Sequence, residues 1–103
     1  MIEDIDVARK MLSLKSSAAS RGLEFNVSFR KMKSLMTRKK CFYTGIIFST
    51  NQDDKYYRSI DRIDSSVGYI DSNIVACTVD INKKKANISV EEIKILATKL
   101  KNK

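Results

Sequence analysis

The sequence has no histidine, no proline and only two cysteines among its 103 residues. A tetrahedral zinc site needs four thiolate or imidazole ligands, so we expect no structural zinc and a scaffold held by apolar packing. Few cysteines and abundant lysine also argue against an oxidised extracellular scaffold. These absences favour a protein of the reducing cytoplasm.

Long apolar runs are also absent, and no stretch approaches the roughly 20 apolar residues of a membrane helix. The N-terminus lacks the basic segment, apolar segment and cleavage site of a secretion signal, so we expect neither secretion nor membrane association. A chain of 103 residues, 43% of them apolar, has the size of one domain with a single modest core.

Positive charge is in clear excess. Lysine and arginine number 20 against 12 aspartate and glutamate residues, which gives a net charge of +8 and a pI near 9.6. Such a balance favours polyanions, because lysines that neutralise phosphates release condensed counterions. A solvated lysine-rich surface would explain the charge equally well, but clustering in segments 30–40, 83–85 and 94–103 favours a polyanionic partner.

The N-terminal residues carry a helical pattern. Apolar residues recur at the spacing of one helix face, at Ile2, Ile5, Ala8, Met11 and Leu12. They predict an amphipathic helix over residues 2 to about 20 that packs over the core, with Gly22 as its C-cap.

A second helix is expected after an extended linker at residues 23–27. Ser28 is a good N-cap, and the helix should end near Arg38. Its apolar stripe is Phe29, Met32, Leu35 and Met36. Its other side is basic and includes Arg30 and Lys33, where a phosphate backbone would lie, although solvation alone would also explain such a face.

Residues 41–48 are β-prone, with Gly45 as a bulge or turn. Near the end of the chain, Ser89 and Glu92 form a capping box that predicts a helix over residues 90 to about 101.

Between these segments, residues 57–87 read as strand, loop, strand and helix. Ile60 and Ile63 alternate with polar residues, which indicates a half-buried strand. Gly68 lies in a polar turn, where a residue free to adopt positive φ is useful. A second apolar run at 74–77 is followed by a polar, lysine-rich helix.

One run of residues carries a family pattern. It consists of Ser59-Ile60-Asp61-Arg62-Ile63-Asp64, Gly68-Tyr69, Asn73-Ile74-Val75, and Asn82 with Lys85, preceded by Arg21-Gly22-Leu23-Glu24-Phe25 and Cys41-Phe42-Tyr43-Thr44-Gly45. In order and spacing this resembles the ββα-metal core of HNH-type endonucleases, most closely a small phage-encoded branch. The resemblance covers residues 17–92. It implies a single α+β domain over residues 1–103, with a helical part at 1–40, a ββα-like core at 41–87 and a C-terminal helix at 88–103.

The resemblance also implies a chemistry. In such nucleases a divalent metal contacts the scissile phosphate, and a histidine deprotonates the attacking water. By position, Asp61 and Asn82 would be the metal ligands, and Asn73 matches the middle asparagine of the family. A carboxylate with an amide oxygen suits magnesium or manganese, and Asp64 or Asp80 could add a ligand.

Two departures from the family pattern stand out. The general-base position falls on Arg62, which stays protonated and cannot accept a proton, although it can grip a phosphate. The paired cysteines of zinc-bearing relatives are missing as well, because Thr44 stands where the partner of Cys41 would be and Cys77 is one position early. Candidate nucleic-acid contacts are Arg58, Arg62, Lys83, Lys84, Lys85, Arg30 and Lys33.

Three hypotheses for function follow. The chain is a magnesium- or manganese-dependent DNA endonuclease or nickase whose base is Asp64 or metal-bound hydroxide, with Asp61, Arg62, Asn73 and Asn82 in its site. Alternatively, it is a catalytically silent HNH-derived protein that binds DNA, with RNA not excluded. The third hypothesis is a phage protein that binds and modulates a host enzyme. The polar residues also allow a purely structural role, as an ion network on the strand surface and as turn caps.

Overall fold

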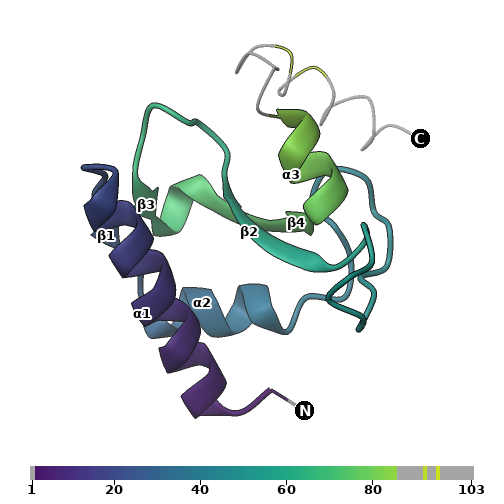
Figure 1. The fold of residues 1–103 in the computed structure, drawn as a ribbon, viewed down its shortest axis with the longest axis horizontal. Helices are drawn as coiled ribbons and strands as arrows, with labels where there is room; N and C mark the ends of the chain where they lie inside the picture. Colours follow the sequence, from purple (N-terminus) through teal and green to yellow (C-terminus); the bar gives the residue numbers. More distant parts are fainter. Residues whose placement is uncertain (1, 86–91, 93–94, 96–103) are drawn as a thin grey trace.

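The computed structural model describes residues 2–85 together with Glu92 and Ile95 (Figure 1). The elements are α1 (Asp4–Ser20), β1 (Phe25–Asn26), α2 (Phe29–Met36), β2 (Arg58–Arg62), β3 (Tyr69–Ile70), a 3-10 helix (Asp71–Asn73), β4 (Ile74–Thr78) and α3 (Val79–Lys85). The predicted α+β class is confirmed. The helix expected over residues 90–101 lies, apart from Glu92 and Ile95, outside the described residues.

Helix α1 matches the predicted range, but its buried face was predicted only in part. Ile2 and Met11 pack against the core as expected. Val7 and Ala18 are fully buried and face the core, whereas Ile5 and Leu12 are 54% and 68% exposed. The helix stops where the sequence indicated, because Gly22 adopts φ 67° and so allows Leu23 to donate back to a carbonyl of the last turn.

Helix α2 begins at the predicted cap. The hydroxyl of Ser28 accepts a hydrogen bond from the backbone N–H of Lys31 at 3.1 Å. The Asp71 carboxylate accepts hydrogen bonds from both the N–H and the hydroxyl of Ser28, each at 2.8 Å. Met32 and Leu35 are buried as expected, but Phe29 is 41% exposed and does not belong to the buried stripe.

The extended linker contains a short strand that the sequence did not indicate. β1 pairs with β3 in parallel, with Phe25 opposite Tyr69. Gly68, just before β3, does not have positive φ, so the reason predicted for this glycine was wrong. A Cβ at Gly68 would stand 2.5 Å from the carbonyl oxygen of Glu24, so glycine is required by the close approach of two backbones.

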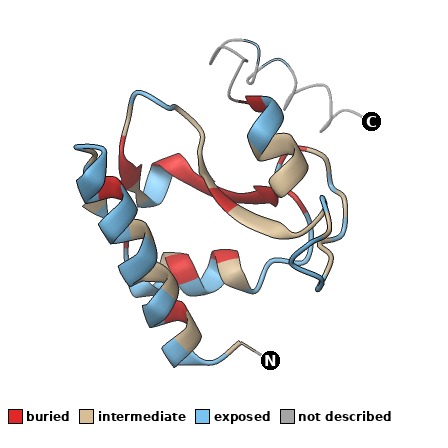
Figure 2. Ribbon diagram, in the orientation of Figure 1, coloured by how far each residue is buried: buried red, intermediate tan, exposed pale blue. Residues whose placement is uncertain are grey.

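The centre of the molecule is an antiparallel pair of strands followed at once by a helix. β2 pairs with β4, with Ile60 opposite Ala76 and Asp61 opposite Val75, and α3 starts directly after β4. All five residues of β4 are buried (Figure 2). Figure 1 shows α3 on one side of this pair and α1 and α2 on the other.

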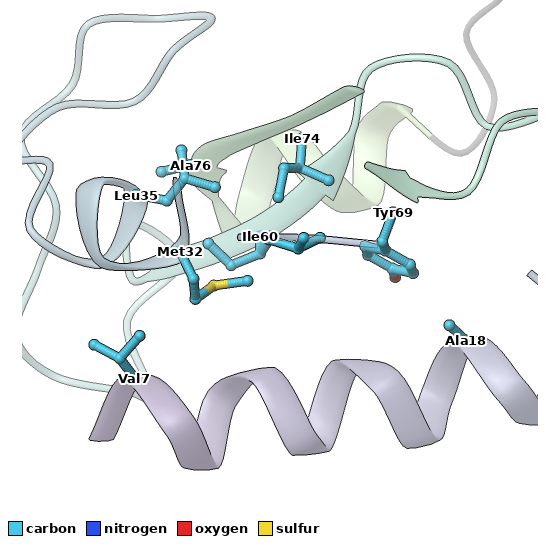
Figure 3. Packing of buried hydrophobic residues seen from close by; sticks show 9 residues of the cluster. Val7, Ala18, Met32, Leu35, Ile60, Tyr69, Ile74 and Ala76 are labelled. Atoms are coloured by element: carbon cyan, nitrogen blue, oxygen red, sulfur yellow. The ribbon is translucent and has the colours of Figure 1, made fainter. Parts of the chain in front are cut away.

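Two apolar clusters cover the two faces of the strand pair, because side chains alternate along a strand. Ile60, Ile74 and Ala76 pack with residues of α1 and α2 (Figure 3). Val75 and Cys77 face the other way and pack with a second cluster that includes Cys41, Tyr43 and Ile81.

Residues 41–48 do not form the β-structure that their composition indicated. They form a turn at 42–44 with one isolated bridge between Lys40 and Ile47. Gly45 is a turn residue, as predicted, with φ 73°. The N–H of Phe42 donates to the carbonyl of Ala76 at 2.9 Å, so this segment is anchored to the edge of β4 by a tertiary hydrogen bond.

Candidate functional site

Asp61 and Lys85 form an ion pair between β2 and α3. The Lys85 ammonium donates to Asp61 Oδ2 and to the backbone carbonyl of Arg62. The two side chains are only 14% and 8% exposed. The ammonium also lies 5.3 Å from the ring centroid of Tyr43, whose hydroxyl donates to Asp61 Oδ2 at 3.5 Å. The carboxylate expected to hold a metal is therefore already in contact with a cation.

Two ionisable side chains beside this pair, those of Tyr43 and Cys77, are buried away from water. Burial raises the pKa of the Tyr43 hydroxyl, and the negative charge of Asp61 raises it further. The pKa of the Cys77 thiol is raised by burial and then by the same carboxylate. Tyr43 and Cys77 therefore stay protonated, and neither is a reactive group at neutral pH.

Asn82 lies one turn before Lys85 on the same side of α3. Its side-chain nitrogen donates to the hydroxyl of Ser59 at 2.8 Å. Ser59 and Asp61 are two residues apart on β2 and so point to the same face. The structure thus brings Asp61 and Asn82 to one interface, as the resemblance implied, but Ser59 and Lys85 lie there as their direct partners.

Asn73 holds a loop. Its side-chain nitrogen donates to the carbonyls of Asp64, Val67 and Gly68 at 3.0 to 3.2 Å, and its oxygen accepts the N–H of Asp64 at 2.9 Å. Both polar ends of the amide are thus engaged with backbone, in the turn-capping arrangement that was one of the alternatives.

Arg62 points to the opposite face of β2 from Asp61, as neighbouring residues on a strand must. Its guanidinium donates to the carbonyls of Ser65 and Val67 at 2.7 and 3.0 Å and lies 5.4 Å from the ring centroid of Tyr69. Arg62 therefore braces the same loop as Asn73, away from the Asp61–Lys85 pair.

As arranged, these residues do not fit a divalent metal. The Lys85 ammonium occupies the space beside the Asp61 carboxylate. Asp64 accepts hydrogen bonds from Ser66, and Asp80 pairs with Lys84. Within residues 2–85, Glu92 and Ile95, no group of three or more acidic, cysteine or histidine side chains is placed to hold a metal ion.

The seven basic residues expected to contact nucleic acid have different surroundings. Arg30, Lys83 and Lys84 are exposed. Lys85 is buried and paired with Asp61, so its ammonium faces the protein interior rather than the surface that a phosphate would reach. Lys33 pairs with Asp4 at 3.0 Å across α1 and α2.

Arg58 is also held internally. Its guanidinium stacks over the Phe48 ring at 4.9 Å and donates to the carbonyl of Arg38, and burial lowers its pKa. Its surroundings, like those of Lys85, depend on contacts between residues far apart in the sequence. In the sequence, the signal for the contact between Lys85 and β2 was the spacing of Asn82 and Lys85. Residues three positions apart lie on the same face of a helix.

The geometry defines an α+β protein with a ββα unit, formed by β2, β4 and α3. A buried ion pair joins β2 to α3. No family model matches the chain, and no solved structure matches it. The chain is similar to an uncharacterized 29.0 kDa protein of Enterobacteria phage T4, with 30% identity over 87 residues, which are 84% of the chain and 35% of that protein. It is also 30% identical over 93 residues to an uncharacterized protein of Acanthamoeba polyphaga mimivirus, covering 90% of the chain and 16% of that protein.

The chain thus spans about a third of the length of the first relative and about a sixth of the second. In the part of the chain that the structure describes, no helix is both long and apolar enough to span a bilayer.

Proposed function

We propose that this chain is a catalytically silent, HNH-like domain that binds DNA through its basic surface. The observation that carries the proposal is the Lys85 ammonium at the Asp61 carboxylate. An HNH nuclease needs a divalent metal at this carboxylate and a base beside it. Here the carboxylate contacts lysine, and the base position is an arginine that braces a loop.

Energetics support this interpretation. Lys85 and Asp61 are both almost fully buried, and removal of one partner from such a pair costs about 3–5 kcal/mol because a buried charge is left uncompensated. A metal that enters beside Asp61 has to displace the ammonium and leave Lys85 buried without its carboxylate, although the metal would then compensate Asp61 itself. The pair therefore disfavours a metal at this carboxylate.

Charge supports a nucleic-acid partner. The net charge of +8 includes exposed Lys83 and Lys84 on α3 and exposed Arg30 on α2. Lysines and arginines on two surface helices suit the phosphate backbone, which is read without regard to base sequence. The relatives are proteins of a phage and of a virus, and we propose that the DNA binding takes place in the cytoplasm of a host cell.

Binding of a labelled DNA duplex, measured by fluorescence anisotropy in EDTA, tests the proposal. We expect binding without metal and an affinity that falls steeply with added salt. The double variant Lys83→Glu/Lys84→Glu should bind all sequences more weakly. Lys15→Glu is the control, since Lys15 is equally exposed but lies on α1. Negligible binding at low salt, or equal loss in both variants, contradicts the proposal.

A metal-dependent nuclease is the second candidate, because Asp61 and Asn82 do lie on facing sides of β2 and α3. Plasmid nicking in magnesium or manganese separates the two. The silent domain predicts no nicking above the background of an Asp61→Asn variant. Metal-dependent nicking that Asp61→Asn abolishes would establish the nuclease instead.

A further inference from the structure

A basic hollow lies between α2, the segment that follows it and β4. We call it the Phe42 hollow. Three cations line it, Lys31, Arg38 and Lys40, and Leu35 and Ala76 contribute apolar lining. Phe42 lies at the same hollow and is 45% exposed, in a protein whose other ring at this turn, Tyr43, is 1% exposed.

The position of Phe42 is well defined despite its exposure. Its backbone N–H donates to the carbonyl of Ala76 on β4 at 2.9 Å. Its ring packs against the buried ring of Tyr43 in an edge-to-face arrangement, with centroids 5.1 Å apart and planes at 83°. A ligand that stacks on Phe42 therefore loses little free energy in ordering the side chain.

Positive charge lines the same hollow as this ring. Arg38 and Lys40 are exposed, and Lys31 is half-buried. One carboxylate lies near Lys31: the pKa of Asp71 is lowered mainly by its hydrogen bonds from Ser28 and in smaller part by the Lys31 charge. Arg38 and Lys40 are thus the principal phosphate-binding candidates.

From this placement we infer that the Phe42 hollow binds one unpaired nucleotide of a single strand, with the base stacked on Phe42 and the flanking phosphates on Arg38 and Lys40. An exposed aromatic ring among cations is the arrangement that single-strand-binding proteins use. A base inside a duplex is already stacked on both faces and cannot reach such a ring. The inference rests on the proposed nucleic-acid binding. It adds that the Phe42 hollow, a second site apart from the lysines of α3, binds single-stranded nucleic acid.

Titration of the whole chain with single-stranded oligonucleotides that contain 2-aminopurine tests the inference, because stacking quenches the fluorescence of this base. Phe42→Ala should weaken binding by about fivefold to a hundredfold and abolish the quenching. Arg38→Gln should retain the quenching and lower the salt dependence by about one phosphate contact. Phe29→Ala is the matched control, since Phe29 is an exposed ring on α2 that does not line the hollow.

The outcomes separate this inference from the proposed function. Equal affinity and quenching in Phe42→Ala and Phe29→Ala overturn the inference while duplex binding still stands. An equal loss of duplex and single-strand affinity in Phe42→Ala also overturns it. Absence of any binding at low salt overturns the proposed function as well. Phe42→Leu keeps an apolar side chain of similar volume but has no aromatic face. If Phe42→Leu loses affinity and quenching as Phe42→Ala does, and its melting temperature is unchanged, misfolding is excluded as the cause.

Discussion

The ion pair between Lys85 and Asp61 gives the sharpest prediction. Lys85→Met keeps the length and apolar stem of the side chain but removes the charge, so the Asp61 carboxylate stays only 14% exposed with the Tyr43 hydroxyl at 3.5 Å as its remaining partner. An uncompensated charge in such a position costs about 3 kcal/mol, at the lower end for broken buried pairs because Asp61 keeps some exposure. For a domain of this size, about 3 kcal/mol lowers the melting temperature by about 12–24 °C.

Urea unfolding of four proteins measures this effect: the wild type, Lys85→Met, Asp61→Asn and the double variant. Each single variant leaves one buried partner unpaired, whereas the double variant leaves none. We therefore expect the double variant to lose at least about 2 kcal/mol less than the sum of the single losses. Lys84→Met is the control, because the Lys84 side chain is 66% exposed and the loss of its pair with Asp80 should cost under about 0.5 kcal/mol. A Lys85→Met loss no larger than that of Lys84→Met, with additive single variants, would refute the buried pair.

Three other predictions concern the β1–β3 contact, the loop at residues 64–68 and the start of α2. Gly68→Ala should destabilise by about 1–3 kcal/mol in urea unfolding, because the new methyl stands 2.5 Å from a backbone oxygen of Glu24; a neutral effect contradicts that close approach. Asn73→Ala should cost about 3 kcal/mol, since a buried amide that engages four backbone groups is lost, and faster hydrogen exchange in the 64–68 loop should accompany the loss. Asp71 has its pKa lowered by hydrogen bonds from Ser28, so its contribution to stability is present above the ordinary carboxyl pKa near 3.9 and disappears as pH falls through the lower folded value. Asp71→Asn should therefore flatten the decline of melting temperature below about pH 4, and an unchanged decline contradicts this.

Local signals in the sequence located the elements well. Gly22 ends α1 because only a residue that tolerates positive φ suits that position, and Ser28 starts α2 because its hydroxyl satisfies a helix N–H. The two apolar runs around residues 60 and 75 form strands because neighbours along a strand alternate between faces. The two helix results depend on interactions between residues a few positions apart, whereas each strand also needs the other as its pairing partner.

Patterns that depend on distant partners were predicted less well. The face of α1 that meets the core carries Val7 and Ala18, so Ile5 and Leu12, which lie outside that face, are exposed. Residues 41–48 have β-prone side chains, but backbone hydrogen bonds between Cys41 and both Gly45 and Ile46 close a turn, which the N–H of Phe42 anchors to β4.

Local patterns in the chain were enough for the α+β class, the end of α1 at Gly22 and the start of α2 at Ser28. They also set the order in which Asp61, Asn73, Asn82 and Lys85 follow one another. Only the tertiary structure decided what these residues contact: Asn73 clamps a loop, and Lys85 neutralises the carboxylate that spacing had offered to a metal. The physical reason is that charge pairing and burial depend on distance in space, and the packing of α3 on β2 brings together groups that are 24 positions apart along the chain.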